Sequence, residues 1–101
     1  MTRLEVIEKM IAKGSRDPFV WYARAMELRS GGQLEKALEA FNDVLREFPD
    51  YLPTYLMTGQ VAKELGKVDH ARTVITDGLA LARKKGDAHT ESELQALGAI
   101  V

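Results

Sequence analysis

The chain has 101 residues, 46% of them apolar, which is enough to build a single core without disulfides or metals. It has no cysteine, which excludes disulfides, thiolate metal sites and thiol nucleophiles and is typical of a reducing compartment, so we expect the cytoplasm. Lysine plus arginine (14) nearly balances aspartate plus glutamate (15), and such a surface does not attract nucleic-acid phosphates. The charges spaced along the N-terminal segment leave no apolar run for a signal peptide or a membrane span.

Glycines and prolines divide the chain into segments whose apolar residues recur every three or four positions, which predicts helices joined by short turns and no strand. The first helix is expected at about 2–13, ending near Gly14, with four apolar residues on its buried stripe: Leu4, Ile7, Met10 and Ile11. The second begins at Asp17-Pro18, a capping acceptor followed by the residue best tolerated in a first turn, and ends at Gly31-Gly32.

Four more helices follow. The third is expected at about 34–47 with a wide apolar stripe, and Pro49 stops it. A fourth is indicated around 55–65, and a fifth from Val68 to the basic residues at 83–85, which suit a helix C-terminus. The last helix has two alternative starts, Asp87 or a capping box at 90–93, and its buried side is expected to carry Leu94 and Leu97.

An offset of 34 residues superposes one stretch of the chain on another. Aromatic then meets aromatic at Trp21 and Tyr55, and small meets small at Ala25 and Gly59. The same offset also pairs Leu28 with Ala62, Gly32 with Gly66, Leu34 with Val68, Ala37 with Ala71, Phe41 with Ile75, Val44 with Gly78 and Leu45 with Leu79. Shifting back by 34 lays Phe41, Val44 and Leu45 over Ile7, Met10 and Ile11, so the first helix resembles the second half of an incomplete earlier unit. A two-helix period of this length is typical of one repeat class.

The residues at these positions resemble the motif of the tetratricopeptide-repeat family, which has an aromatic residue, a small residue, a turn glycine, an alanine, a second aromatic residue and a closing proline. The first unit has all six: Trp21, Ala25, Gly32, Ala37, Phe41 and Pro49. Tyr55, Gly59, Gly66 and Ala71 supply four in the second. The resemblance implies an all-α fold of about six helices, in which antiparallel helix pairs stack as a short right-handed superhelix. We expect one domain over 1–101, made of an N-terminal helix at 2–14, repeats at 18–51 and 52–85, and a capping helix at 87–101.

Two positions depart from the family, which usually has a leucine where this chain has Arg24 and Thr58. In one interpretation Arg24 lays its aliphatic stem on the core and its head reaches water. In the other, the two residues form a polar pair that helps to select a ligand. The sequence leaves both open.

Catalysis is not expected. The two histidines, His70 and His89, fall in different predicted helices without metal-ligand spacing, and we expect both at the surface. The acidic residues have the helical spacing of solvated faces. No enzyme, metal or cofactor is therefore predicted.

The resemblance implies a protein-binding module, because the first helix of each pair in this family lines a concave face that takes a peptide or helix of a partner protein. We expect three apolar anchors for partner side chains, which are Tyr22, Met26 and Leu56. Gln60 could bond a partner backbone, and two cations, Arg29 and Lys63, could meet an acidic group. Tyr22 and Met26 could instead contact the capping helix or another copy of the chain.

An adaptor is the leading hypothesis. The alternative is a structural homo-oligomer whose groove is filled by its own C-terminal helix, since a third full repeat is usually needed for stability.

Overall fold

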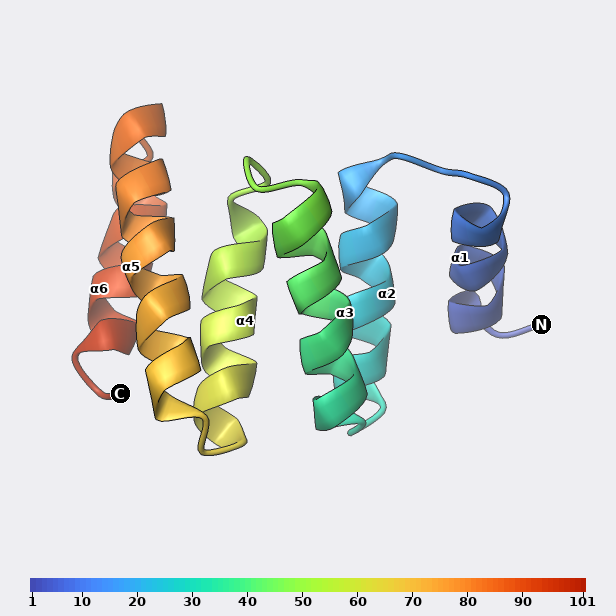
Figure 1. The fold of residues 1–101 in the computed structure, drawn as a ribbon, viewed down its shortest axis with the longest axis horizontal. Helices are drawn as coiled ribbons and strands as arrows, with labels where there is room; N and C mark the ends of the chain where they lie inside the picture. Colours follow the sequence, from blue (N-terminus) through green and yellow to red (C-terminus); the bar gives the residue numbers. More distant parts are fainter. The chain divides into compact units, whose positions relative to one another are not determined.

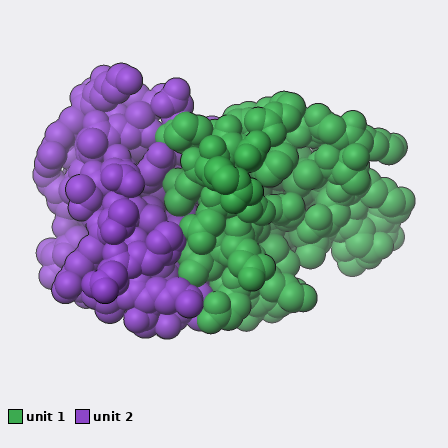
Figure 2. Space-filling view, viewed as in Figure 1, with its two compact units in different colours: residues 1–49 green, residues 50–101 purple.

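The computed structural model describes residues 1–101 and consists of six α-helices without a β-strand (Figure 1). In chain order they are α1 (Arg3–Ala12), α2 (Pro18–Ser30), α3 (Leu34–Glu47), α4 (Pro53–Glu64), α5 (Val68–Lys85) and α6 (Ala88–Gly98). The prediction of an all-α fold built from helix pairs is confirmed. No helix combines the length and the apolar character that crossing a membrane requires. The helices form two compact units, unit 1 (1–49) and unit 2 (50–101), which Figure 2 draws in different colours.

In unit 1, α2 and α3 form a pair around a core of small and large residues. Ala25 of α2 and Ala37 of α3 are fully buried, as are Phe41 and Val44 of α3. The Tyr22 and Phe41 rings meet edge to face with centroids 6.0 Å apart. The two alanines let the helices approach closely and the larger side chains fill the remaining space, as the repeat pattern predicts.

Helix α1 packs mainly against α2. A capping box starts it, in which the Thr2 hydroxyl accepts from the Glu5 N–H (3.1 Å) and the Glu5 carboxylate accepts from the Thr2 N–H (3.3 Å). Ile7 is buried, as predicted, but the prediction that Met10 is buried is wrong, because its side chain is 44% exposed. The reason is that α2 covers only part of the apolar stripe of α1.

The segment between α1 and α2 is held by an aromatic and ionic contact. The Trp21 indole donates to the carbonyl of Ser15 (2.8 Å), and its ring meets that of Phe48 edge to face at 5.5 Å. The Arg16 guanidinium lies 4.7 Å from the centroid of the Phe48 ring and pairs with Glu47 at 3.0 Å. These contacts fix the approach of the chain to α2.

In unit 2, α4, α5 and α6 all contact one another, and two glycines allow the close packing. A Cβ at Gly59 would lie 3.0 Å from Leu97 Cδ2, and a Cβ at Gly78 would lie 2.7 Å from Tyr55 Cβ. Gly78 stands where unit 1 has Val44, so α4 and α5 approach more closely at this point than a larger residue would allow.

The start of α6 is decided by Asp87. Its carboxylate accepts from the Thr90 N–H (2.9 Å) and from the Thr90 hydroxyl (2.9 Å), so the helix begins at Ala88, the first of the two predicted alternatives. These two hydrogen bonds lower the pKa of the Asp87 carboxyl. Helix α5 begins at Val68, as predicted, and this first residue is 38% exposed. His89 is exposed as predicted, whereas His70 is half-buried.

Candidate functional site

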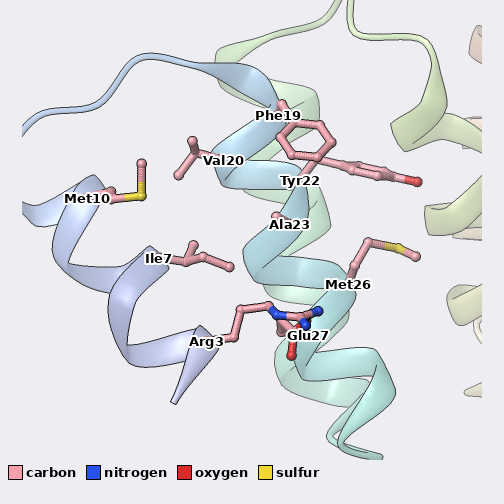
Figure 3. Close-up of a pocket in the computed structure, with 9 residues that line it drawn as sticks. All are labelled: Arg3, Ile7, Met10, Phe19, Val20, Tyr22, Ala23, Met26 and Glu27. Atoms are coloured by element: carbon pink, nitrogen blue, oxygen red, sulfur yellow. The ribbon is translucent and has the colours of Figure 1, made fainter. Parts of the chain in front are cut away.

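Unit 1 has an apolar pocket between α1 and α2, which we name the α1–α2 pocket. It has a volume of about 500 Å³ and is lined by Arg3, Ile7, Met10, Phe19, Val20, Tyr22, Ala23, Met26 and Glu27. In Figure 3, Ile7 and Met10 reach from α1 toward α2, and Val20 reaches back from α2. Tyr22 and Met26 point away from α1 in this view, so they form an edge of the pocket.

Two of the lining side chains are large, apolar and exposed. Phe19 is 60% exposed and Met10 is 44% exposed, whereas Ile7 and Val20 are buried beneath them. Contiguous exposed apolar surface that forms a concave hollow is typical of a binding site, because covering it removes apolar surface from water.

The charged side chains of the pocket are already paired. Arg3 Nη1 lies 3.0 Å from Glu27 Oε1, which links the first turn of α1 to the last part of α2. The Arg3 side chain is 79% exposed, so the pair adds little to stability. The rest of the lining is apolar apart from the Tyr22 hydroxyl, so the pocket is suited to binding apolar side chains.

Unit 2 has a smaller hollow between α4 and α6, which we name the α4–α6 pocket. It measures about 320 Å³ and is lined by Leu56, Gln60, Glu93, Ala96, Leu97 and Ile100. Ile100 is 67% exposed. The structure therefore places four of the predicted contact residues in two hollows, Tyr22 and Met26 in one, Leu56 and Gln60 in the other. Arg29 and Lys63 line neither, and their binding role stays a prediction.

Arg24 and Thr58 lie in different surroundings. Arg24 Nη2 pairs with Asp43 Oδ2 at 2.8 Å, and the Arg24 side chain is only 15% exposed, so its head is held by a carboxylate rather than reaching freely into water. Arg24 lines a polar hollow of about 440 Å³ together with Asp43, Glu39 and others. Thr58 is fully buried and its hydroxyl donates to the carbonyl of Thr54 (2.7 Å), one turn earlier in α4. Thr58 therefore has a local structural role.

Comparisons with known proteins agree with the fold. The family model described as "Tetratricopeptide repeat" matches residues 18–61. A tetratricopeptide-repeat domain protein of Salinibacter ruber, known from a crystal structure, is 32% identical, with a TM-score of 0.78 over 83% of this chain and 93% of that chain. This chain belongs to the tetratricopeptide-repeat family.

Other relatives extend this tetratricopeptide-repeat (TPR) similarity along the chain. A TPR repeat-containing protein of Pseudomonas aeruginosa is 28% identical over 91 residues, which are 90% of this chain and 87% of that protein. The solution structure of a Bordetella parapertussis protein, at 24% identity, shares the fold with a TM-score of 0.82 over 98% of this chain and 86% of that chain. TPR domains are in general protein–protein interaction modules and typically non-enzymatic scaffolds.

The contribution of α1 to the pocket was not predicted from the sequence. Ile7 and Met10 were assigned to a buried stripe, and Arg3 to none. The repeat register contains the clue, because Ile7 and Met10 align with Phe41 and Val44, residues that the preceding helix of a TPR pair covers. Within residues 1–101, α1 has no such preceding helix.

Proposed function

We propose that this TPR chain is an adaptor that binds a peptide or helix of a partner protein, and that the α1–α2 pocket is its principal contact surface. The observation that carries the proposal is the exposure of Phe19 and Met10 around a hollow of about 500 Å³. Covering a large apolar side chain fully is worth about 1.5–3 kcal/mol. Two or three such anchors are enough for a specific, reversible contact.

The predicted contact residues have distinct roles in this proposal. Tyr22 and Met26, at the edge of the α1–α2 pocket, provide an aromatic face and a flexible thioether that adapts to the shape of a partner. Leu56 and Gln60, in the α4–α6 pocket, provide an apolar contact and an amide for a partner backbone. Arg29 and Lys63 meet acidic groups of the partner.

The proposal excludes catalysis by this pocket. Arg3 and Glu27 are its two charged residues, and each neutralises the other. A bound partner would therefore meet an apolar surface with one ion pair whose two charges already neutralise each other.

A matched pair of substitutions on α1 tests the proposal. Met10 and Val6 are each 44% exposed on the same helix, but only Met10 lines the α1–α2 pocket. Affinity capture from the native lysate would compare wild type, Met10→Asp and Val6→Asp, with circular dichroism showing that all three are folded. We expect a partner retained by wild type and Val6→Asp and lost by Met10→Asp. Equal recovery by all three proteins would exclude the α1–α2 pocket as the contact surface.

A further inference from the structure

The α4–α6 pocket of unit 2 presents one charge on a mostly apolar surface. Its apolar lining residues are Leu56, Ala96, Leu97 and Ile100. Leu97 is buried, so its side chain lies at the base of the hollow. The two polar side chains of the lining are the neutral amide of Gln60 and the carboxylate of Glu93. Glu93 therefore sets the charge that a bound molecule meets in this pocket.

No arginine or lysine of the chain neutralises Glu93. The carboxylate contacts His89 of the preceding helical turn, with Glu93 Oε1 3.3 Å from His89 Nε2, and this contact is an ion pair only while His89 is protonated. The His89 side chain is 86% exposed and that of Glu93 is 44% exposed, so water competes for both groups. Histidine side chains lose their charge as the pH rises through the neutral range, and above pH 7 the pocket therefore keeps a negative charge.

Two other glutamates show the contrast with Glu93. Glu91, on the same helix, pairs with Arg83 of α5 at 2.7 Å. In the α1–α2 pocket, Glu27 pairs with Arg3 at 3.0 Å. Each of these two carboxylates has a permanent counter-charge within the chain, and Glu93 does not. The two pockets therefore differ in charge: the α1–α2 pocket is neutral, and the α4–α6 pocket lacks a cation beside its apolar surface.

We infer that the α4–α6 pocket binds a segment of the partner protein in which a lysine or arginine stands next to a large apolar side chain. The apolar side chain covers Leu56 and Leu97, and the cation lies beside Glu93. The inference rests on the proposed function and names the chemistry of the partner. The volume of about 320 Å³ lies at the lower end of the range for binding pockets, which suits one side chain and its neighbour.

The charge of Glu93 selects against other segments at this pocket. A carboxylate of the partner at the same place would be repelled by Glu93. A neutral apolar segment would cover the apolar surface but would remove water from the Glu93 carboxylate without supplying a counter-charge. Lys63, three residues after Gln60 on α4, does not line the pocket and so does not offset this charge there. A segment that is both basic and apolar satisfies the two requirements together.

A matched pair of short peptides tests the inference on the 101-residue chain. The probes are acetyl-leucyl-arginyl-leucine amide and its citrulline counterpart, in which a neutral urea group of similar shape replaces the guanidinium. Each is titrated above pH 7 into protein labelled at leucine and isoleucine methyl groups, and the shifts of Leu56, Leu97 and Ile100 give the Kd. We expect saturable shifts at these methyls. The arginine peptide should bind about 2- to 5-fold more tightly, the usual gain from a partly exposed ion pair.

Two substitutions on α6 assign this preference to one carboxylate. Glu93→Gln should abolish the preference for the arginine peptide. Glu91→Gln is the matched control, because it changes the net charge by the same amount on the same helix but lies outside the pocket, and it should leave the preference unchanged. Circular dichroism shows whether both variants are folded.

The outcomes separate this inference from the proposed function. The absence of saturable shifts, equal affinity of wild type for the two peptides, or a preference that survives Glu93→Gln overturns the inference. Loss of a captured partner with Met10→Asp tests the proposed function independently, so that function stands if only the peptide titration fails. Shifts of the same methyls when the protein is concentrated without peptide, absent in Glu93→Gln, would assign the pocket to a second copy and overturn the choice of partner.

Discussion

Substitution of Gly78 by alanine should destabilise the protein, although alanine is the better helix former. The added Cβ would lie 2.7 Å from Tyr55 Cβ and 3.0 Å from Leu94 Cδ1. Because Tyr55 Cβ is fixed to the backbone of α4, the two helices must move apart rather than one side chain turning. Overpacking costs about 1–3 kcal/mol, and an approach of 2.7 Å to an atom fixed to the backbone places Gly78→Ala in the upper half of this range, at about 2–3 kcal/mol. The gain in helix propensity returns about 1 kcal/mol. We expect a net loss of about 1–2 kcal/mol.

Thermal and urea unfolding followed by circular dichroism at 222 nm measure this loss. In a domain of this size, 1–2 kcal/mol corresponds to a fall of about 5–15 °C in the melting temperature. Gly98→Ala is the matched control, because its Cβ would lie 3.4 Å from Ile75 Cγ2, an ordinary contact, and we expect a change within about 0.5 kcal/mol. If Gly78→Ala were as stable as wild type, the close packing of α4 on α5 would be refuted.

Three further outcomes follow from the packing and charge of unit 1. Phe41→Ala should cost about 3–5 kcal/mol in urea unfolding, because the fully buried ring leaves a cavity, and an unchanged midpoint would contradict this packing. The hydrogen bond from Arg16 lowers the pKa of the Glu47 carboxyl, so the stability it contributes is present above its unfolded pKa and is lost as the pH falls through the folded value. Thermal melts from pH 6 to 3 should therefore show a shallower decline for Glu47→Gln, and parallel curves would argue against this pair. Arg24→Leu should be neutral or slightly stabilising, because Asp43 is partly exposed and keeps its pair with Arg46 at 2.8 Å. A loss above about 2 kcal/mol would show that the Arg24–Asp43 pair is needed.

The sequence predicts most of the fold because the repeat motif occurs in two units of the chain. Aromatic, small and turn residues recur at the same offset, so each unit supports the assignment of the other. The prediction is correct for α3 at 34–47 and for the end of α5 at Lys85. The start of α6 stayed open in the sequence because Asp87 and Thr90 are both good capping residues, and the two Asp87–Thr90 hydrogen bonds decide it.

The candidate site was predicted only in part. Tyr22 and Met26 could be assigned to a hollow because they lie next to the core stripe of α2, but periodicity alone placed Met10 in the core. Periodicity reports which face of a helix is apolar and not whether another helix covers that face. Exposure of Met10 is a property of tertiary packing, since α1 is covered mainly by α2.

Methyl NMR of the 101-residue chain tests most directly whether the α1–α2 pocket binds a partner protein. A partner recovered by affinity capture with wild type would be titrated into protein labelled at isoleucine and methionine methyl groups. Ile7, Met10 and Met26 line the pocket, whereas Ile75 and Met57 lie in unit 2 and serve as internal references. We predict saturable shifts at the three pocket methyls and little change at the two references. Shifts confined to unit 2, or no shifts at all, would contradict this site.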